Sequence, residues 1–172
     1  MITDEELKYL YRLKTIIRYN TRRHLKDESV AEHSFYVAII SLIICNKLNI
    51  SEEDTGKCII KALLHDMPEI ETSDIPHDIK ENLNLRGYLK TYEDKYFEDN
   101  FPKYYELMTK DCNIDDIVLL ADSLSVLQYS NNEVELGNTS KEMLVIQQDA
   151  VDRVKKLYQK VNNRKEKYNN EN

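Results

Sequence analysis

Four side chains of the types that bind divalent metal ions lie in three separate stretches of this sequence. They are His33, the adjacent pair His65 and Asp66, and Asp122. Neutral imidazole combined with carboxylate is a ligand set suited to Zn, Mn, Fe, Co, Ni or Mg. A divalent ion with open coordination positions makes bound water reactive and neutralises charge on a phosphoryl oxygen. Together, the four residues predict a metal-dependent hydrolytic site.

The positions of these residues limit how they can meet. Consecutive residues on a regular helix point about 100° apart, so His65 and Asp66 can converge only where a helix ends or distorts. Pro68 supplies a reason for an ending there. Asp122 lies within the apolar segment LLADSLSVL, where a buried carboxylate needs a cation or hydrogen bonds. One histidine or aspartate alone is more often a surface group or a cap, so the prediction rests on the combination.

Helical periodicity runs through most of the chain and predicts the elements that carry these residues. Only three glycines occur, which argues against Rossmann turns and phosphate-binding loops. No segment alternates apolar and polar residues as a half-buried strand would. Capping residues precede several apolar runs: Thr3, Ser29, Ser51 and Thr139. The predicted helices cover about residues 4–17, 30–48, 52 to the His65-Asp66 pair, 89–108, 114–129 and 139–161.

Three stretches are expected to shape the site. Residues 30–48 are apolar on more than one face, which predicts a central buried helix with His33 in its first turn. Residues 18–29 are polar and basic and predict a connector. Residues 69–80 are rich in carboxylates and poor in apolar periodicity, which predicts an irregular active-site loop leading into another helix. The fold class predicted is an all-α, single-domain helical bundle.

Length and composition narrow the function classes. The 172 residues suit one domain, over about residues 1–165, with a frayed tail at 166–172. A formal net charge of -7 argues against binding a nucleic-acid polymer, although a small anion could bind locally. Three cysteines without a C-x-x-C pair predict a reducing, cytoplasmic environment. We expect no membrane contact, because the N-terminus lacks a signal pattern and no apolar run approaches the roughly 18 residues that span a bilayer.

The motifs VAEHSFYVA, LLHDMPEIETSDIP and LLADSLSVL resemble those of the HD-domain metal-dependent phosphohydrolases. Within that superfamily the chain looks most like the 5′-deoxynucleotidases, since RLKTIIRYN and the three motifs occur in the same order across roughly residues 7–135. The resemblance implies an all-α fold with a central divalent metal ion held by His33, His65, Asp66 and Asp122. It implies hydrolysis of deoxynucleoside 5′-monophosphates to deoxynucleoside and phosphate by metal-activated water. It also suggests a homodimer.

The same resemblance implies roles for residues around the metal. Arg18 matches the family's phosphate-binding arginine, and Glu69 matches a carboxylate that orients or activates the attacking water. Asp74 matches a second acidic residue near water and sugar, and Asp66 is expected to act in catalysis as well as in metal binding. Tyr19 stands where relatives of this type usually place a tryptophan against the sugar. His77 is close in sequence and is either a substrate contact or an ordinary surface histidine.

Two other functions stay open at this point, with hydrolysis of signalling nucleotides such as cyclic dinucleotides or ppGpp as a minor third option. Small members of the superfamily cleave deoxynucleoside triphosphates to nucleoside and triphosphate with the same ligands, so a triphosphohydrolase such as a dATPase is one alternative. A regulatory domain that kept the fold without turnover is the other. Identification of the released product separates the two hydrolases, and a metal-supplemented assay without turnover on any nucleotide favours the regulatory domain.

Overall fold

The computed structural model describes residues 2–110 and 112–170, and within these it leaves out the side chains of residues 77, 78 and 164–170. The predicted all-α class is confirmed: in the part of the chain described, the one pairing of extended backbone is an isolated bridge between Ile17 and Ser29. The elements, with 3-10 helices written η, are α1 Asp4–Tyr11, η1 Arg12–Lys14, α2 Val30–Leu48, α3 Glu52–Leu64, α4 Glu69–Thr72, α5 His77–Asn82, α6 Arg86–Asn100, η2 Pro102–Tyr104, α7 Tyr105–Thr109, α8 Asp115–Glu135 and α9 Lys141–Asn170.

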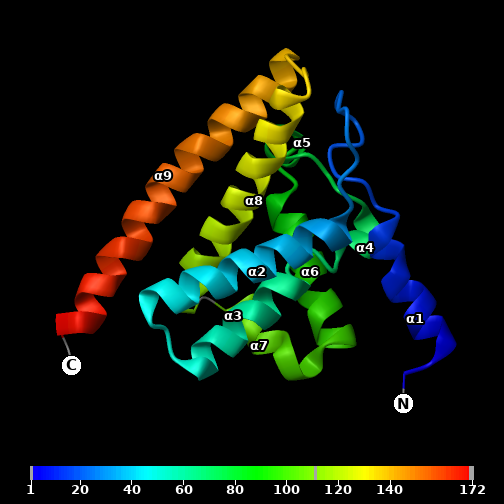
Figure 1. Cartoon of the computed structure of the whole chain (residues 1–172). Helices are drawn as coiled ribbons and strands as arrows, with labels where there is room; N and C mark the ends of the chain where they lie inside the picture. Colours follow the sequence, from blue (N-terminus) through cyan, green and yellow to red (C-terminus); the bar gives the residue numbers. More distant parts are fainter. Residues whose placement is uncertain (1, 111, 171–172) are drawn as a thin grey trace.

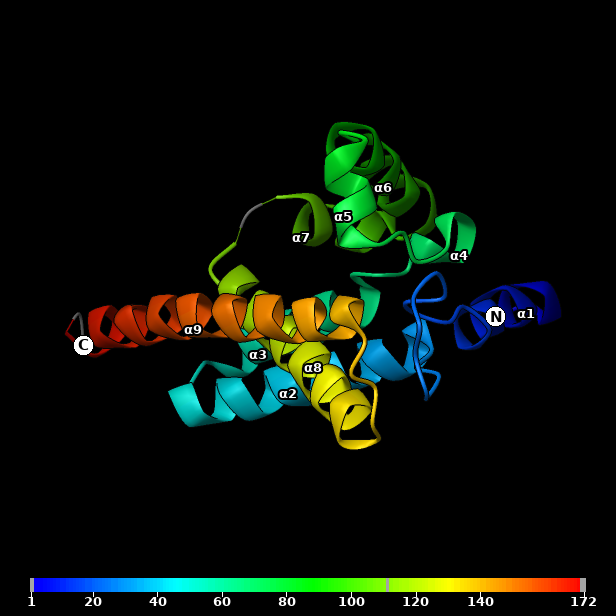
Figure 2. The same ribbon diagram turned by 90° about the horizontal axis from the view of Figure 1, so that it is seen from above.

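Helix α2 is at the centre of the bundle. It packs against α3 on one side and α8 on another, and α9 lies along the outer side of α8 (Figures 1 and 2). The main buried cluster comes from α2, α3 and α8 with Ile114: Val37, Ala38, Cys45, Cys58, Ala62, Ile114, Ile117, Val118 and Ala121. Both views place the two termini at opposite ends of the molecule. The predicted metal ligands belong to α2, α8 and the end of α3, so the core packing brings them near one another.

A second, smaller cluster lies beneath α4 and α6. It is formed by Met67, Ile70, Tyr96 and Phe97, with partly buried residues of α1 and η1 packed against it. Figure 2 shows α5, α6 and α7 gathered on one side of the plane of α2 and α8. This cluster fixes the segment after His65 and Asp66 against the N-terminal helices, and so it sets where Glu69 lies.

Helix starts agree well with the capping residues in the sequence. The Thr3 hydroxyl accepts from the backbone N–H of Glu6 in a capping box, and Ser29 caps α2 in the same manner. The Ser51 hydroxyl caps α3 by accepting from the N–H of Asp54. The prediction of Thr139 as the last cap was wrong by one residue, because the hydroxyl of Ser140 accepts from the N–H of Met143 at 3.3 Å. Gly137, with φ 102°, makes the turn before it.

Several predicted helix ends were wrong. The first helix ends at Tyr11 instead of residue 17, because the chain turns to form the Ile17–Ser29 bridge. The predicted helix over 89–108 is broken after Asn100 by the 3-10 helix that starts at Pro102. Helix α8 continues to Glu135, six residues beyond the prediction of 129, since the polar residues there face solvent or hydrogen-bond within the fold.

Residues 69–80 are also more regular than predicted. They contain two short helices, α4 and the first part of α5, instead of an irregular loop. Pro68 and Pro76 immediately precede these helices, where a residue without an N–H costs no helical hydrogen bond. Between the helices, Ser73 takes a positive φ of 59° at the end of α4.

The prediction that α2 is buried on most sides was wrong for one face. Five large side chains on it are exposed: Phe35, Tyr36, Ile39, Leu42 and Ile43. Helix α2 is also long and apolar enough to meet a length-and-composition criterion for a membrane span. Its other face is the core of the bundle, however, and His33, Val37 and Cys45 on that face have no exposed surface. The apolar residues of α2 therefore belong to the core on one side of the helix and form an exposed surface on the other.

Candidate active site

Three of the four predicted metal ligands, His33, His65 and Asp66, form one group at the centre of the molecule, and Asp122 lies against His33. Oδ1 of Asp122 lies 3.1 Å from Nε2 of His33, and Oδ2 of Asp66 lies 3.6 Å from the same nitrogen. Oδ2 of Asp66 is also 3.2 Å from Nε2 of His65. Ligand atoms of His33, His65 and Asp66 all lie within 4.8 Å of one another, close enough to bind one ion. The structure thus brings together residues separated by up to 89 positions in the sequence.

The local backbone explains how two adjacent residues reach one point. Helix α3 ends at Leu64, and residues 65–68 form turns before α4 begins at Glu69. His65 and Asp66 therefore leave the regular helix, as the position of Pro68 predicted. His33 in the first turn of α2 and Asp122 in the middle of α8 then face them because α2 packs against both α3 and α8.

Hydrogen bonds fix which nitrogen of each imidazole faces the carboxylates. Nδ1 of His65 is 2.7 Å from the carbonyl oxygen of Ala62, which can only accept, so this nitrogen carries the proton. Nδ1 of His33 lies 3.2 Å from the hydroxyl oxygen of Ser125. In both rings Nε2 is left as the inward-facing nitrogen, which is the arrangement found in metal-binding histidines.

The donor atoms fit a divalent cation. Nε2 of His33 and Nε2 of His65 are buried, and neither has a hydrogen-bond partner of acceptable geometry among the described residues. Burial opposes ionisation of Asp66, but the neighbouring His65, His33 and Arg18 hold the pKa of its carboxyl well below the usual range. Two inward-facing imidazole nitrogens beside ionised carboxylates form a neutral-plus-anionic ligand set of the kind that binds Zn, Mn, Fe, Co or Ni.

Arg18 lies against this cluster on the connector between η1 and α2. Its side chain is buried, and Nη1 donates to Oε2 of Glu28 at 3.0 Å. The Nε group is buried without a hydrogen-bond partner. The charges of Asp66 and Asp122 act on the guanidinium and help to raise the pKa of Arg18 despite its burial. An always-charged, partly unsatisfied guanidinium beside a metal site is suited to bind an oxyanion.

Tyr19, the residue after Arg18, has a strained backbone conformation. Its φ of 57° is left-handed, which is uncommon for a residue with a bulky side chain. The Tyr19 N–H donates to Oδ2 of Asp74 at 2.7 Å, and its ring stacks on that of Tyr129 with centroids 5.2 Å apart. Burial raises the pKa of Tyr19 to about 12, so the phenol stays neutral. Asp74 thus holds the backbone of the residue that follows Arg18.

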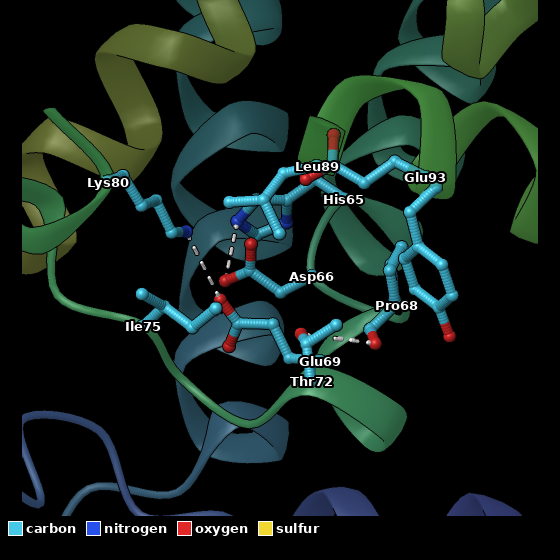
Figure 3. A pocket seen from close by; sticks show the side chains of 10 residues that line it. His65, Asp66, Pro68, Glu69, Thr72, Ile75, Lys80, Leu89 and Glu93 are labelled. Atoms are coloured by element: carbon cyan, nitrogen blue, oxygen red, sulfur yellow. Dashed lines mark hydrogen bonds and ion pairs between the residues drawn. The ribbon is translucent and has the colours of Figure 1, made fainter. Parts of the chain in front are cut away.

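Glu69 lies directly beside the metal-ligand cluster. Figure 3 shows Glu69 and Asp66 facing the same space as Lys80, whose Nζ is 3.9 Å from Oε1 of Glu69. His65, Asp66, Glu69 and Lys80 line a cavity of about 40 Å³, which exceeds the roughly 15 Å³ that one water needs. Burial, with the nearby charges of Asp66 and Asp74, raises the pKa of Glu69 to about 9. A carboxyl group in this position can accept or donate a proton.

Sequence reasoning did not identify three residues that complete the site. Ser125 orients His33, Glu28 pairs with Arg18, and Tyr129 stacks on Tyr19. Ser125 lies one helical turn after Asp122, and that spacing could have indicated it. No sequence signal indicated Glu28 or Tyr129. The side chain of His77 lies outside the described residues, so its predicted substrate contact stays a prediction.

A family model described as 5′-deoxynucleotidase YfbR-like matches residues 6–167 of this chain. The chain belongs to the YfbR-like 5′-deoxynucleotidase family. It is therefore an enzyme, a metal-dependent phosphohydrolase of deoxynucleoside monophosphates, as the motifs around His33, His65 and Asp122 predicted.

Individual relatives agree with this assignment. The YfbR-like chain is 28% identical over 163 residues to the 4′-phosphooxetanocin A phosphatase of Priestia megaterium, across 88% of this chain and 83% of that one. It is 27% identical over 144 residues to a 5′-deoxynucleotidase of Pasteurella multocida, across 75% of this chain and 74% of the relative.

The fold is shared with a solved structure. An HD phosphohydrolase of cyanophage S-2L, bound to dA and one catalytic Zn²⁺ ion, superposes with a TM-score of 0.67 at 15% identity, covering 97% of this chain and 99% of that one. At this low identity the likeness shows a common HD fold.

Proposed function

We propose that this YfbR-like enzyme hydrolyses deoxynucleoside 5′-monophosphates with a single divalent ion bound by His33, His65, Asp66 and Asp122. The observation that carries the proposal is the pair of buried, inward-facing Nε2 atoms beside two carboxylates. The Zn²⁺ ion of the cyanophage protein with the same fold is consistent with this ligand set, and the identity of the ion is left open among Co, Mn, Zn, Ni, Fe and Mg. When bound, the ion would acidify a water molecule and offset charge on a phosphoryl oxygen.

Arg18 would bind the phosphate group of the substrate. Its guanidinium is fixed by Glu28 on one edge and keeps an unsatisfied Nε. Planar guanidinium groups bind phosphate oxygens in pairs, and they keep their charge at any physiological pH. Asp74 would support this role by holding the N–H of Tyr19, and Tyr19 would lie against the sugar.

Glu69 would take the proton from the attacking water. Its carboxyl lines the small cavity next to Asp66, and burial with the charges of Asp66 and Asp74 raises its pKa. A bound divalent cation would favour the ionised carboxylate, which is the form that accepts a proton. Lys80 faces the same carboxyl and would limit how far that pKa rises. Asp66 would bind the ion and lie next to the reacting phosphate group.

Monophosphates are favoured over triphosphates as substrates. Two relatives are named as a 4′-phosphooxetanocin A phosphatase and as a 5′-deoxynucleotidase. A triphosphohydrolase would release tripolyphosphate from a deoxynucleoside triphosphate. Product identification therefore distinguishes the two reactions directly.

We further propose that the enzyme is a homodimer. Phe35, Tyr36, Ile39, Leu42 and Ile43 lie within an arc of about 120° on α2 and are exposed. No charged residue lies between positions 35 and 43, so the face lacks the complementary charge that a polar partner would need. A second copy presents the same uncharged apolar face, which suits a two-fold contact.

A cytoplasmic location is proposed on the state of the cysteines. Cys45, Cys58 and Cys112 are all free. Free thiols persist in reducing compartments, while secreted domains of this size commonly use disulfides.

The central experiment assays the purified protein against deoxynucleoside mono- and triphosphates with each candidate metal and identifies the products. We expect phosphate and deoxynucleoside from monophosphates. His65→Ala should lose bound metal and activity together, whereas Glu69→Gln should keep the metal and lose most turnover. Activity retained by metal-free His65→Ala would disprove the metal site, and full activity of Glu69→Gln would disprove its role as proton acceptor.

A further inference from the structure

A groove of about 700 Å³ lies next to the candidate active site and takes no part in the chemistry described so far. Tyr19 and Arg22 of the connector line one side, and Val145 and Ile146 of α9 line the other. This volume falls within the roughly 300–1,000 Å³ typical of small-molecule sites. The cavity at Glu69, at about 40 Å³, is far too small for a nucleotide.

Tyr19 connects the groove to the proposed phosphate site at Arg18. Tyr19 lines the groove, and the guanidinium carbon of Arg18 lies 5.2 Å from the centroid of the Tyr19 ring. Pro76, two residues after Asp74, also lines the groove. A molecule with its phosphate at Arg18 and its sugar at Tyr19 would therefore extend from the active site into this groove.

The lining has the chemistry of a nucleobase site. Tyr19, Pro76, Val145 and Ile146 provide apolar surface, and the other six lining residues are charged: Arg22, Lys141, Glu142, Asp149, Asp152 and Arg153. A nucleobase has two apolar faces that pack against aromatic and aliphatic side chains, and polar edges that form hydrogen bonds. The groove offers both kinds of contact.

We propose that this groove receives the base of the deoxynucleotide and that Val145 and Ile146 form the wall against which the base packs. The proposal rests on the hydrolysis of deoxynucleotides proposed above and adds its specificity element. Helix α9 begins at the same end of the molecule as the connector that carries Tyr19 (Figure 1). Base preference is then decided on α9, separately from the metal site at α2, α8 and the end of α3 and from the phosphate site at Arg18 on the connector.

The test compares two substrates that differ only in the base. Val145→Trp fills the groove, so kcat/KM for dAMP should fall by roughly tenfold or more, the effect expected from losing one base contact. The value for 2-deoxyribose 5-phosphate, which has no base, should stay within about twofold, since its phosphate and sugar contacts are unchanged.

Leu144→Trp is the matched control. Leu144 precedes Val145 on α9 and is similarly exposed, at 43% against 49%, but it does not line the groove. Leu144→Trp should leave kcat/KM for both substrates unchanged. The proposal is overturned if Val145→Trp leaves dAMP hydrolysis unchanged, or if it lowers hydrolysis of both substrates equally.

A binding measurement keeps this test separate from the proposed activity. Wild type and the two variants are titrated with deoxyadenosine by calorimetry, which needs no turnover. Weaker binding in Val145→Trp alone supports the groove as the base site, and equal affinity in all three proteins overturns it. Absence of dAMP hydrolysis by the wild-type protein would instead contradict the proposed function.

Discussion

His33 and His65 each use one ring nitrogen to hold the imidazole in place and leave the other toward Asp66 and Asp122. A backbone carbonyl does this for His65, and the Ser125 hydroxyl does it for His33. Such partners of metal-binding histidines set the tautomer and the ring orientation, and their loss typically lowers metal affinity or activity by about 10- to 100-fold. Ser125 is therefore a positioning residue for the metal site.

Ser125→Ala should weaken metal binding by about 10- to 100-fold. The His33 ring would lose the contact that orients its Nδ1, while all four proposed ligands stay present. Affinity is measured by competition with a chelator. Ser130→Ala is the control, because the Ser130 hydroxyl is also buried on α8 but donates to Leu127 within the helix. Equal affinities in the two variants would contradict the role given to Ser125.

Arg18→Lys should raise KM for dAMP at least about tenfold and weaken inhibition by inorganic phosphate to a similar degree, with a smaller change in kcat. Lysine keeps the positive charge beside Glu28 but lacks the planar pair of donors. Steady-state kinetics at fixed metal concentration measure both constants. Arg23→Lys, on an exposed position of the same connector, should change neither. An unaltered KM in Arg18→Lys would remove the phosphate role.

At the level of elements, the connector over residues 18–29 is held by the end of α8. The carboxylate of Glu133, 1% exposed, accepts from the backbone N–H groups of Leu25 and Lys26 at 2.8 Å each. Asn138 donates to the same carboxylate at 2.7 Å and also bonds the carbonyl of Arg23. A polar segment without regular structure is thereby fixed, and with it the two residues, 18 and 19, that would meet the substrate.

Glu133→Gln should lower the free energy of unfolding by about 2 kcal/mol, because one of the two backbone donors loses a charged acceptor. Although burial opposes its ionisation, the hydrogen bonds from Asn138, Leu25 and Lys26 lower the pKa of Glu133. A lowered pKa in the folded state stabilises the protein above the carboxyl's unfolded pKa, and this contribution is lost as pH falls through the folded pKa.

Urea denaturation at several pH values measures this effect. The wild type should lose stability relative to Glu133→Gln as the pH falls below about 4, the ordinary range of a glutamate. The difference between the two proteins should be constant near pH 7. A difference that does not change with pH would show that the Glu133 carboxylate is not the origin of the stability.

At the scale of the whole molecule, the bundle leaves one face of its central helix uncovered. Helix α2 is covered by α3 and α8 on its other sides, so the exposed residues Phe35, Ile39 and Leu42 face away from the metal site. A second copy of the chain that covers this face would bury apolar surface on the side of α2 opposite its core contacts. The dimer contact and His33, in the first turn of α2, would then lie on the same helix.

Ile39→Glu should convert the proposed dimer to a monomer, because two glutamates would face each other in an apolar contact. Sedimentation at micromolar concentrations should show half the mass of the wild type. The matched control is Leu136→Glu, which places the same charge on an exposed leucine outside α2. A wild-type protein that is monomeric throughout this range would refute the dimer.

The local sequence determined much of this protein. Helix periodicity indicated the all-α class, hydroxyl caps at Thr3, Ser29 and Ser51 located three helix starts, and residue types selected the proposed metal ligands. These features depend on contacts between residues a few positions apart, and local geometry alone decides them. The domain limit near residue 165 and the frayed tail at 166–172 stay predictions.

Only the tertiary structure decided which groups meet across the bundle. Glu28 beside Arg18, Tyr129 beside Tyr19 and Glu133 beneath the connector are partners chosen by how the helices pack, and no local pattern indicates them. The same holds for the exposed face of α2, because an apolar helix has the same sequence whether a neighbour covers it or not. Burial and long-range pairing depend on the arrangement of whole helices, which residue spacing along one helix does not specify.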